Sequence, residues 1–319
     1  MLDLLKELKD CDTVAISGHV RPDGDCIGSV MGTYLYLRKV FPEKTIIPMI
    51  EKPAPEFSVI SGIDDIVTDF QPGVPRFDAF IGLDSSSPDR YGDAGIYFET
   101  AKKTIVIDHH ISNEGFGDLR YIDGEASSTC ELICDLMDRS LADKEIAMPL
   151  YIGIIHDTGV LQYSNVSPKT LNTVAWLIGY GFDFSKIIEE TFYERTRLQN
   201  EMLGRALIES ITFMDGKCIA SKIDKKTMEF YGADSHAFEG IVNQLRFTKG
   251  VEVAIFMYEV ESMEYKVSLR SRGLVDVAKI AKFYDGGGHA RAAGFTMKGT
   301  FYDIVNNISD SIAIQLDEE

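Results

Sequence analysis

The amino-acid sequence predicts an α/β protein of two domains, in which a mainly parallel-sheet domain is joined by a connecting helix to a smaller mixed α/β domain. In the first half of the chain, short apolar runs alternate with helical stretches, as in parallel sheets with crossover helices. In the second half, strand-like runs pair around turn signals, which is typical of antiparallel strands. The 319 residues suffice for two hydrophobic cores. We expect the three parts to span residues 1–184, 185–211 and 212–319.

The first part contains four predicted strands and four predicted helices. Pro149 suits the first turn of a helix, so we expect one helix to begin there. The predicted strands cover residues 13–17, 45–50, 77–83 and 104–107, and the predicted helices cover 25–39, 129–139, 149–156 and 168–180.

The middle part, residues 185–211, is polar and helical in pattern but lacks a dense apolar face, which favours a connecting helix. In the third part, Asp215-Gly216 separates two short strands, as expected for a hairpin. Asp276 can cap the helix that follows it. The predicted strands there cover 211–214, 218–223, 251–260, 265–270 and 293–297, and the predicted helices cover 276–283 and 301–316.

The charge balance is strongly acidic, with 32 basic and 50 acidic residues and a net charge of −18. Proteins that coat long nucleic acids usually present broad basic surfaces, so we do not expect that function. A small phosphorylated ligand remains compatible with this charge if metals and a few arginines concentrate positive charge locally.

The cysteine content and the apolar runs indicate the cellular compartment of the protein. The five cysteines are odd in number and lack a paired C-x-x-C spacing, which argues against a disulfide framework or a zinc cluster. No apolar run approaches the ~20 residues that span a bilayer, and the charged, amphipathic start does not resemble a signal peptide. We therefore expect a cytoplasmic protein without a membrane partner.

The run from Thr104 to His110 is the most informative stretch. An apolar, β-branched strand ends there on Asp108-His109-His110, so one carboxylate and two imidazoles follow its carboxyl end. Open α/β sheets bind ligands at that edge. An ordinary strand end with a polar loop is the alternative for this motif taken alone.

Three other apolar elements also end on Asp or His. His19, Asp23 and Asp25 follow the first strand, although Asp25 could instead cap the next helix while Asp23 is solvated. Asp84 ends another strand but could simply begin a serine-rich turn. Asp157 follows a predicted helix, where exposed polar groups are also common.

The candidate metal ligands from these elements are two imidazoles, His19 and His109, and four carboxylates, Asp23, Asp25, Asp84 and Asp157. Four carboxylates in one site would repel one another, and two divalent cations would neutralise them. Imidazole and carboxylate ligands without a thiolate favour Mn²⁺, with Mg²⁺ or Co²⁺ as alternatives. A pair of such ions suits attack of activated water on a phosphoryl group.

The ordered motifs resemble those of the DHH phosphoesterase superfamily, in the type that pairs a DHH domain with a DHH-associated domain. The greatest similarity is to the nano-RNase/pAp phosphatase group, and the resemblance spans essentially the whole chain. The matching motifs are His19-Val-Arg-Pro-Asp23-Gly-Asp25, Asp84, Asp108-His109-His110, Asp157-Thr-Gly and, in the second half, residues 285–294 (Asp-Gly-Gly-Gly-His-Ala-Arg-Ala-Ala-Gly).

The resemblance implies a role for each residue of the first domain. Asp84 would bridge two metals, with a water between them as the nucleophile. His110 would contact the scissile phosphate, and Asp108 would orient the neighbouring groups without contacting the metals. His156 has no implied role, and a structural or a catalytic one is equally compatible with the sequence. The implied ligands are His19, Asp23 and Asp84 for the first metal, and Asp25, Asp84, His109 and Asp157 for the second.

In the second domain the resemblance implies a substrate-binding surface that holds the non-scissile end of the substrate. Glycine-rich backbone can approach a phosphate closely. Residues 241–298 carry nine Lys or Arg against six Asp or Glu, a net +3 in an acidic chain. Asp285 stands where many members of the family have a further glycine. The implied substrate-binding residues are Arg270, Ser271, Gly286, Gly287, Gly288 and His289.

The predicted function is therefore a Mn²⁺-dependent phosphoesterase with its active site between two domains. It would release nucleoside 5′-monophosphates from short RNAs and dinucleotides such as pApA, and remove the 3′-phosphate of pAp. The alternatives are a cyclic-di-AMP phosphodiesterase, an inorganic pyrophosphatase and a catalytically silent nucleotide-binding module. We leave open whether the chain forms a homodimer.

Overall fold

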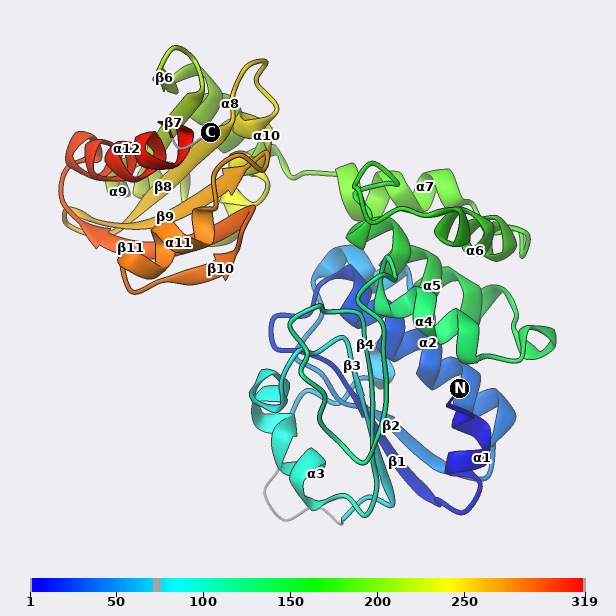
Figure 1. Ribbon diagram of the computed structural model, residues 1–319. Helices are drawn as coiled ribbons and strands as arrows, with labels where there is room; N and C mark the ends of the chain where they lie inside the picture. The colour runs from blue at the N-terminus through cyan, green and yellow to red at the C-terminus, as the bar shows by residue number, and fades with distance from the viewer. Residues whose placement is uncertain (1, 71–75, 318–319) are drawn as a thin grey trace. The chain divides into compact units, whose positions relative to one another are not determined.

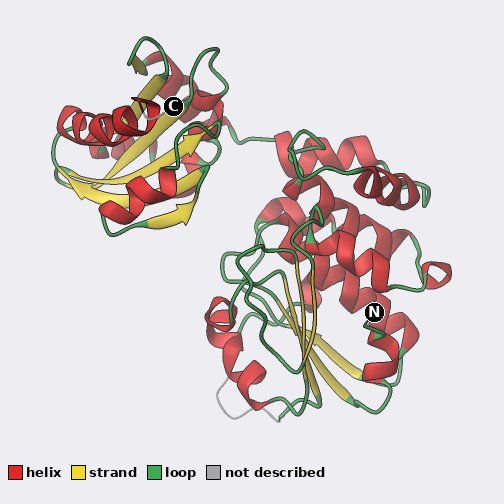
Figure 2. Cartoon of the chain, viewed as in Figure 1, coloured by secondary structure: helices red, strands yellow, loops and turns green. Residues whose placement is uncertain are grey.

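The computed structural model describes residues 2–70 and 76–317 of the chain (Figure 1). The chain divides into two compact units, Met1–Glu194 and Arg195–Glu319. One unit holds a five-stranded sheet and the other a six-stranded sheet, each combined with helices, so the predicted α/β class is confirmed (Figure 2). None of the helices described here combines the length and the apolar content that a bilayer-spanning segment needs.

The first unit is built on a sheet whose strands are all parallel, in the order β2-β1-β3-β4-β5. The strands are β1 (Thr13–Ser17), β2 (Thr45–Pro48), β3 (Ala79–Leu83), β4 (Thr104–Asp108) and β5 (Leu119–Ile122). The first four agree with the predicted strands to within a few residues. The edge strand β5 was not predicted, because it is only partly buried and carries Arg120 within a short run.

Successive residues of these strands face opposite sides of the sheet and enter different cores. Ile16, Ile81 and Ile107 contribute to the larger core, whereas Ala15 and Phe80 pack in a smaller, aromatic core. The larger core includes residues of α1 (Leu4–Leu8), α2 (Gly24–Val40), α4 (Thr129–Leu136), α5 (Lys144–Asp157) and α6 (Pro168–Ile178), and the smaller one includes residues of α3 (Gly95–Thr100) and the 3₁₀ segment Pro88–Ala94.

Helix α5 begins earlier than the sequence pattern predicts. Asp143 caps it by accepting hydrogen bonds from the backbone N–H groups of Glu145 and Ile146, so Pro149 lies inside the helix rather than in its first turn. The prediction of a start at Pro149 was therefore wrong, because a strong cap upstream fixes the helix start.

Close packing of α2 on α5 depends on a glycine. A Cβ atom at Gly28 would lie 2.4 Å from the backbone oxygen of Pro149 and 3.0 Å from the backbone nitrogen of Gly153. Because these are backbone atoms, only a movement of one helix could relieve the contact. The glycine therefore sets how closely α2 approaches α5.

We expect Gly28→Ala to lower the free energy of unfolding of the first unit by about 1–3 kcal/mol, the usual cost of overpacking. Urea unfolding followed by fluorescence of Trp176 measures this, since the chain has a single tryptophan and it lies in this unit. Gly204→Ala in the other unit, where a Cβ would meet nothing within 4 Å, is the matched control. An unchanged Trp176 transition in Gly28→Ala would show that the helices can separate at no cost.

The segment predicted as one connecting helix, residues 185–211, consists of two helices with a break between them. Helix α7 (Phe184–Ile188) runs into a π-helical turn, Glu189–Tyr193, and α8 (Arg197–Ile208) begins anew. Thr196 and Gln199 form a capping box at that start, which is a strong helix-initiation signal. Met202 of α8 is buried in the core of the second unit, so α8 belongs to that unit.

The second unit contains a mixed sheet in the order β10-β11-β9-β8-β7-β6. Both predicted strand pairs are confirmed as antiparallel, and β7 pairs with β8 in parallel. The predicted glycine loop is partly a strand, because β10 pairs with β11. The strands are β6 (Ile211–Phe213), β7 (Cys218–Ile223), β8 (Val253–Glu261), β9 (Glu264–Ser271), β10 (Gly287–His289) and β11 (Ala292–Lys298).

Helices cover both faces of this sheet. Ile255 of β8 packs in one core with α11 (Val277–Phe283) and α12 (Phe301–Asp317), whereas Phe256 packs in another with α8 and α10 (Ile241–Arg246). Asp276 caps α11 as predicted. Helices α9 (Lys225–Tyr231) and α10 were not predicted, since both are short.

Candidate active site

The candidate site lies at the carboxyl ends of three neighbouring parallel strands. Strand β1 lies between β2 and β3, so the strand order reverses at β1, and ligands of open α/β sheets bind outside such a point. His19 follows β1 by two residues, Asp84 follows β3 directly, and Asp108 ends β4. The parallel topology therefore brings together side chains that are far apart in the sequence.

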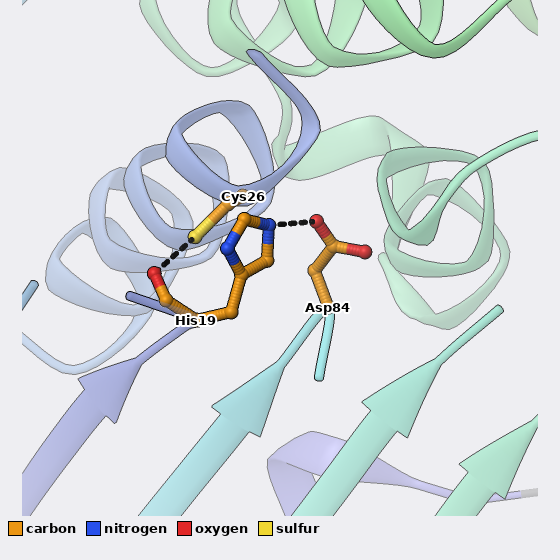
Figure 3. A group of neighbouring side chains, drawn as sticks. All are labelled: His19, Cys26 and Asp84. Carbon is orange, nitrogen blue, oxygen red and sulfur yellow. Dashed lines mark hydrogen bonds and ion pairs between the residues drawn. The ribbon is translucent and has the colours of Figure 1, made fainter. Parts of the chain in front are cut away.

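Asp84 occupies the centre of the site. Its Oδ2 lies 3.5 Å from Nε2 of His19, and its Oδ1 lies 3.5 Å from Nε2 of His109 (Figure 3 shows the His19 side). The residue is 2 % exposed and has a positive φ of 53°, a conformation that aspartate tolerates better than most residues. Each oxygen of this carboxylate thus faces a different imidazole.

On the first side of Asp84, His19 is joined by Asp23. Nε2 of His19 lies 3.7 Å from Oδ1 of Asp23. The same Asp23 oxygen caps α2 by accepting from the backbone N–H groups of Asp25 and Cys26, both at 3.1 Å. The alternative in which Asp25 caps this helix is therefore wrong, and Asp23 has that role.

On the second side, His109 faces two more carboxylates. Its Nε2 lies 3.8 Å from Oδ2 of Asp25 and 3.7 Å from Oδ2 of Asp157. Asp25 is 1 % exposed and accepts hydrogen bonds from the backbone N–H groups of Thr129 and Cys130, at 2.7 and 3.0 Å. These N–H groups open α4, where the helix dipole favours a negative charge.

Asp108 holds the neighbouring His110 in place. Oδ1 of Asp108 lies 2.7 Å from Nδ1 of His110, and Oδ2 accepts from Nδ2 of Asn113 at 2.7 Å. Asp108 is fully buried, whereas 30 % of the His110 side chain is exposed. With Nδ1 engaged, Nε2 of His110 is the ring atom available to an external group.

Crowding of the carboxylates changes their proton affinities. Burial and the charge of Asp84 raise the pKa of Asp25 well above its usual value. Burial also raises the pKa of Asp157 to about 6, although His109 opposes this shift. Burial alone would lower both histidine pKa values, but the neighbouring carboxylates of Asp23 and Asp84 raise the pKa of His19 to about 10, and the carboxylates around His109 raise its pKa to about 9. Without cations, the site therefore retains protons.

The donor atoms fit two divalent cations. Two ligand atoms that are each ~2.1 Å from one metal at tetrahedral to octahedral angles are separated by roughly 3.0–3.4 Å. The observed N···O separations of 3.5–3.8 Å are slightly longer than this and too long for hydrogen bonds. His19, Asp23 and one oxygen of Asp84 could hold one cation, and Asp25, the other oxygen of Asp84, His109 and Asp157 could hold the second.

The buried thiol of Cys26 lies beside His19 and Asp84. Sulfur of Cys26 and ligand atoms of His19 and Asp84 lie within 4.8 Å of one another (Figure 3). The thiol donates to the backbone oxygen of His19 at 3.7 Å. Burial and the charge of Asp84 raise the pKa of this cysteine well above its usual value, so it remains a thiol that supports the His19 backbone.

Sequence reasoning missed Thr129 and Asn113. Oγ1 of Thr129 donates to Oδ1 of Asp84 at 3.1 Å, and Asn113 contacts Asp108 as described above. Both residues lie outside the recognised motifs. Asn113 follows the Asp-His-His motif by three residues, a weak local signal, whereas Thr129 is 45 residues from Asp84.

His156 packs inside the first unit. Its Nε2 lies 3.0 Å from Oγ1 of Thr191, and its ring packs against Phe57 and Phe192. Burial lowers its pKa to about 4, so the imidazole is neutral. A Cβ on Gly24 would lie 2.3 Å from Cγ of His156, which shows how closely its ring packs against the start of α2.

The residues predicted to bind substrate in the second unit have different environments. Ser271 is fully buried, its hydroxyl donates to Glu252 and accepts from the backbone of Gly273, and it therefore stabilises a turn. Nε of Arg270 donates to Asn243 at 3.0 Å. Gly287, Gly288 and His289 are exposed on β10, whereas Gly286 packs against the backbone of Gly294.

We expect Mn²⁺ binding at pH 7.5 to release at least two protons, because His19 and His109, with pKa values of about 10 and 9, must lose theirs to ligate, and the pKa of a third ligand, Asp25, is also raised. The affinity should therefore rise as the pH increases from 7 to 9. Calorimetry in buffers of different ionisation enthalpy measures the released protons. Binding that releases none would contradict this assignment of protonation states.

Comparisons with known proteins identify the domains of this chain and its relatives. Residues 13–154 match the DHH family N-terminal domain, and residues 215–313 match the DHHA1 domain. A Thermus thermophilus protein named bifunctional oligoribonuclease and PAP phosphatase NrnA is 32 % identical, over 91 % of this chain and 86 % of that protein. The Bacillus subtilis protein of the same name is 29 % identical over 92 % of this chain and 91 % of that one.

A solved structure has the same fold over nearly the whole chain. The crystal structure of an exopolyphosphatase-related protein from Bacteroides fragilis superimposes with a TM-score of 0.87 at 25 % identity, covering 97 % of this chain and 94 % of that one. The family assignment rests on both domain matches, on relatives that match over most of the chain, and on the cluster of imidazoles and carboxylates. The chain belongs to the DHH family of metal-dependent phosphoesterases, with an N-terminal DHH domain followed by a DHHA1 domain.

Proposed function

We propose that this protein is a two-metal phosphoesterase that hydrolyses short oligoribonucleotides and dinucleotides such as pApA to nucleoside 5′-monophosphates, and that also removes the 3′-phosphate of pAp. The names of the Thermus thermophilus and Bacillus subtilis relatives support both activities. The placement of Asp84 between two imidazoles is the observation that carries the proposal, since a bridging carboxylate is what a metal pair requires. The proposed cofactor is Mn²⁺, two ions per site, with Mg²⁺ or Co²⁺ as substitutes.

When bound, the cations would neutralise the carboxylates, activate a water molecule and stabilise charge on the phosphoryl group. The residues of the chain supply the rest. Asp25 stays anchored at the start of α4, so its position does not depend on the substrate. His110, oriented by Asp108, presents Nε2 to the scissile phosphate or to the leaving oxygen. A positioned imidazole that donates a proton to a leaving oxygen contributes roughly 10²–10⁴-fold to a rate.

In the second unit, we propose that Arg270, His289 and the glycines of β10 bind the non-scissile end of the substrate. His289 and the neighbouring Gly287 and Gly288 are exposed, as such a role requires. Ser271 contributes through the turn that it stabilises rather than through its hydroxyl, which is already engaged. Binding of a chain end would favour substrates of two to five nucleotides over long RNA, in agreement with the net charge of −18.

A turnover panel tests the function. The Mn²⁺-loaded protein is assayed with pApA, pAp, a five-nucleotide RNA, cyclic-di-AMP and pyrophosphate, and chelated protein is the control. We expect Mn²⁺-dependent release of mononucleotides from the linear substrates and of phosphate from pAp. Turnover of pyrophosphate alone would identify an inorganic pyrophosphatase, and preference for cyclic-di-AMP would identify a cyclic-dinucleotide phosphodiesterase. Tight nucleotide binding without turnover would identify a silent binding module.

A further inference from the structure

We infer that Thr129 is a positioning residue that fixes the orientation of the bridging carboxylate, and that it acts mainly on the second metal position. This inference rests on the proposed two-metal function. Thr129 is fully buried at the start of α4 and contacts two of the carboxylates in the site. Its hydroxyl donates to Oδ1 of Asp84 at 3.1 Å, and its backbone N–H donates to Oδ2 of Asp25 at 2.7 Å.

The hydroxyl distinguishes the two oxygens of Asp84. Oδ1 accepts from Thr129 and lies 3.5 Å from Nε2 of His109, whereas Oδ2 lies 3.5 Å from Nε2 of His19. A carboxylate can rotate broadly about its terminal torsion unless a hydrogen bond holds it. With this hydrogen bond present, Oδ1 of Asp84 remains on the His109 side and keeps a lone pair that can bind the second cation. Removing a hydrogen bond to a carboxylate that ligates a metal typically lowers metal affinity or activity 10–100-fold.

A buried network holds Thr129 in its position. The Glu131 carboxylate, which is 1 % exposed, accepts from the hydroxyls of Ser127 at 2.5 Å and Thr170 at 2.8 Å. Asn165 donates from the same Nδ2 to the backbone oxygens of Ser127 and Asp157, at 2.9 and 3.2 Å. The segment before α4 is therefore tied to α6 and to the end of α5, which carries Asp157. These hydrogen bonds fix the backbone just ahead of α4, which suits a residue that orients a ligand.

The test compares Thr129→Val, which removes only the hydroxyl and keeps the backbone N–H to Asp25, with Thr129→Ser, which retains the hydroxyl. Thr33→Val is the matched control, because Thr33 is a fully buried threonine on α2 whose hydroxyl makes no hydrogen bond among the described residues. Mn²⁺ binding is measured by calorimetry, and unfolding of the metal-free proteins is followed by Trp176 fluorescence.

We expect two binding events in the wild type, with the second weakened 10–100-fold in Thr129→Val and the first changed less. Thr129→Ser should restore most of the second affinity, and Thr33→Val should bind like the wild type. Equal affinities in Thr129→Val and wild type would overturn the inference while leaving the two-metal function intact. So would a serine variant that binds as weakly as the valine variant. A wild-type protein that bound no Mn²⁺ would overturn the proposed function and this inference with it.

Discussion

Replacing Asp84 by asparagine should reduce hydrolysis of pApA by about 10³-fold, the upper end of what loss of one preorganised electrostatic group costs. Asp84 is the only residue within the described chain whose two carboxylate oxygens each face the Nε2 atom of a different histidine, at 3.5 Å on both sides. An amide has the same shape but carries no charge and offers a single good metal ligand. Both metal positions should therefore lose affinity together, and the Mn²⁺ stoichiometry measured by calorimetry should fall below two.

Asp64→Asn is the control for this experiment, since Asp64 is an exposed carboxylate in the same unit. We expect it to retain wild-type turnover and to bind two ions. Substantial Mn²⁺-dependent turnover by Asp84→Asn, with unchanged stoichiometry, would show that the carboxylate does not bridge the cations.

The second large effect concerns the two adjacent histidines, which should respond differently to replacement. His109→Ala should weaken binding of one Mn²⁺, because Nε2 of His109 faces Asp25, Asp84 and Asp157. His110→Ala should bind both ions and lose about 10²–10⁴-fold in kcat, because Nδ1 of His110 is held by Asp108 and its Nε2 is left for the phosphate.

Calorimetry and steady-state kinetics on the same two variants measure these effects. His236→Ala is the control, since His236 is an exposed histidine of the second unit. Identical defects in His109→Ala and His110→Ala would contradict the division of roles. If His110→Ala lost a metal ion and His109→Ala did not, the roles of the two histidines would be the reverse of those proposed.

The sequence predicted the strands of both units except β5 and β10, because the others are apolar runs bounded by clear turn or loop signals. The sequence-based prediction failed where the start of a helix depended on a capping residue or on packing against distant parts of the chain. Asp143 moved the start of α5 ahead of Pro149, and the capping box at Thr196 divided the expected connecting helix. The short strand β10 was also not predicted, since its glycines have no side-chain pattern and only pairing with β11 defines it.

The sequence by itself determined the chemical composition of the candidate site, because the candidate metal ligands stand directly after apolar elements. His19, Asp84, Asp108 and His109 could all be identified in this way, together with the phosphoesterase family that carries them. The class of fold followed from the same apolar runs, since hydrophobic periodicity is a local property of the chain.

Only the tertiary structure decided which residues contact one another in the site. The contacts of α4 show that Thr129 and the start of α4 hold Asp84 and Asp25, and the contact with Thr191 shows that the His156 ring is engaged within the first unit. The physical reason is that a hydrogen bond between residues 45 or 104 positions apart leaves no local pattern in the sequence. Such contacts exist only once the helices have packed on the sheet.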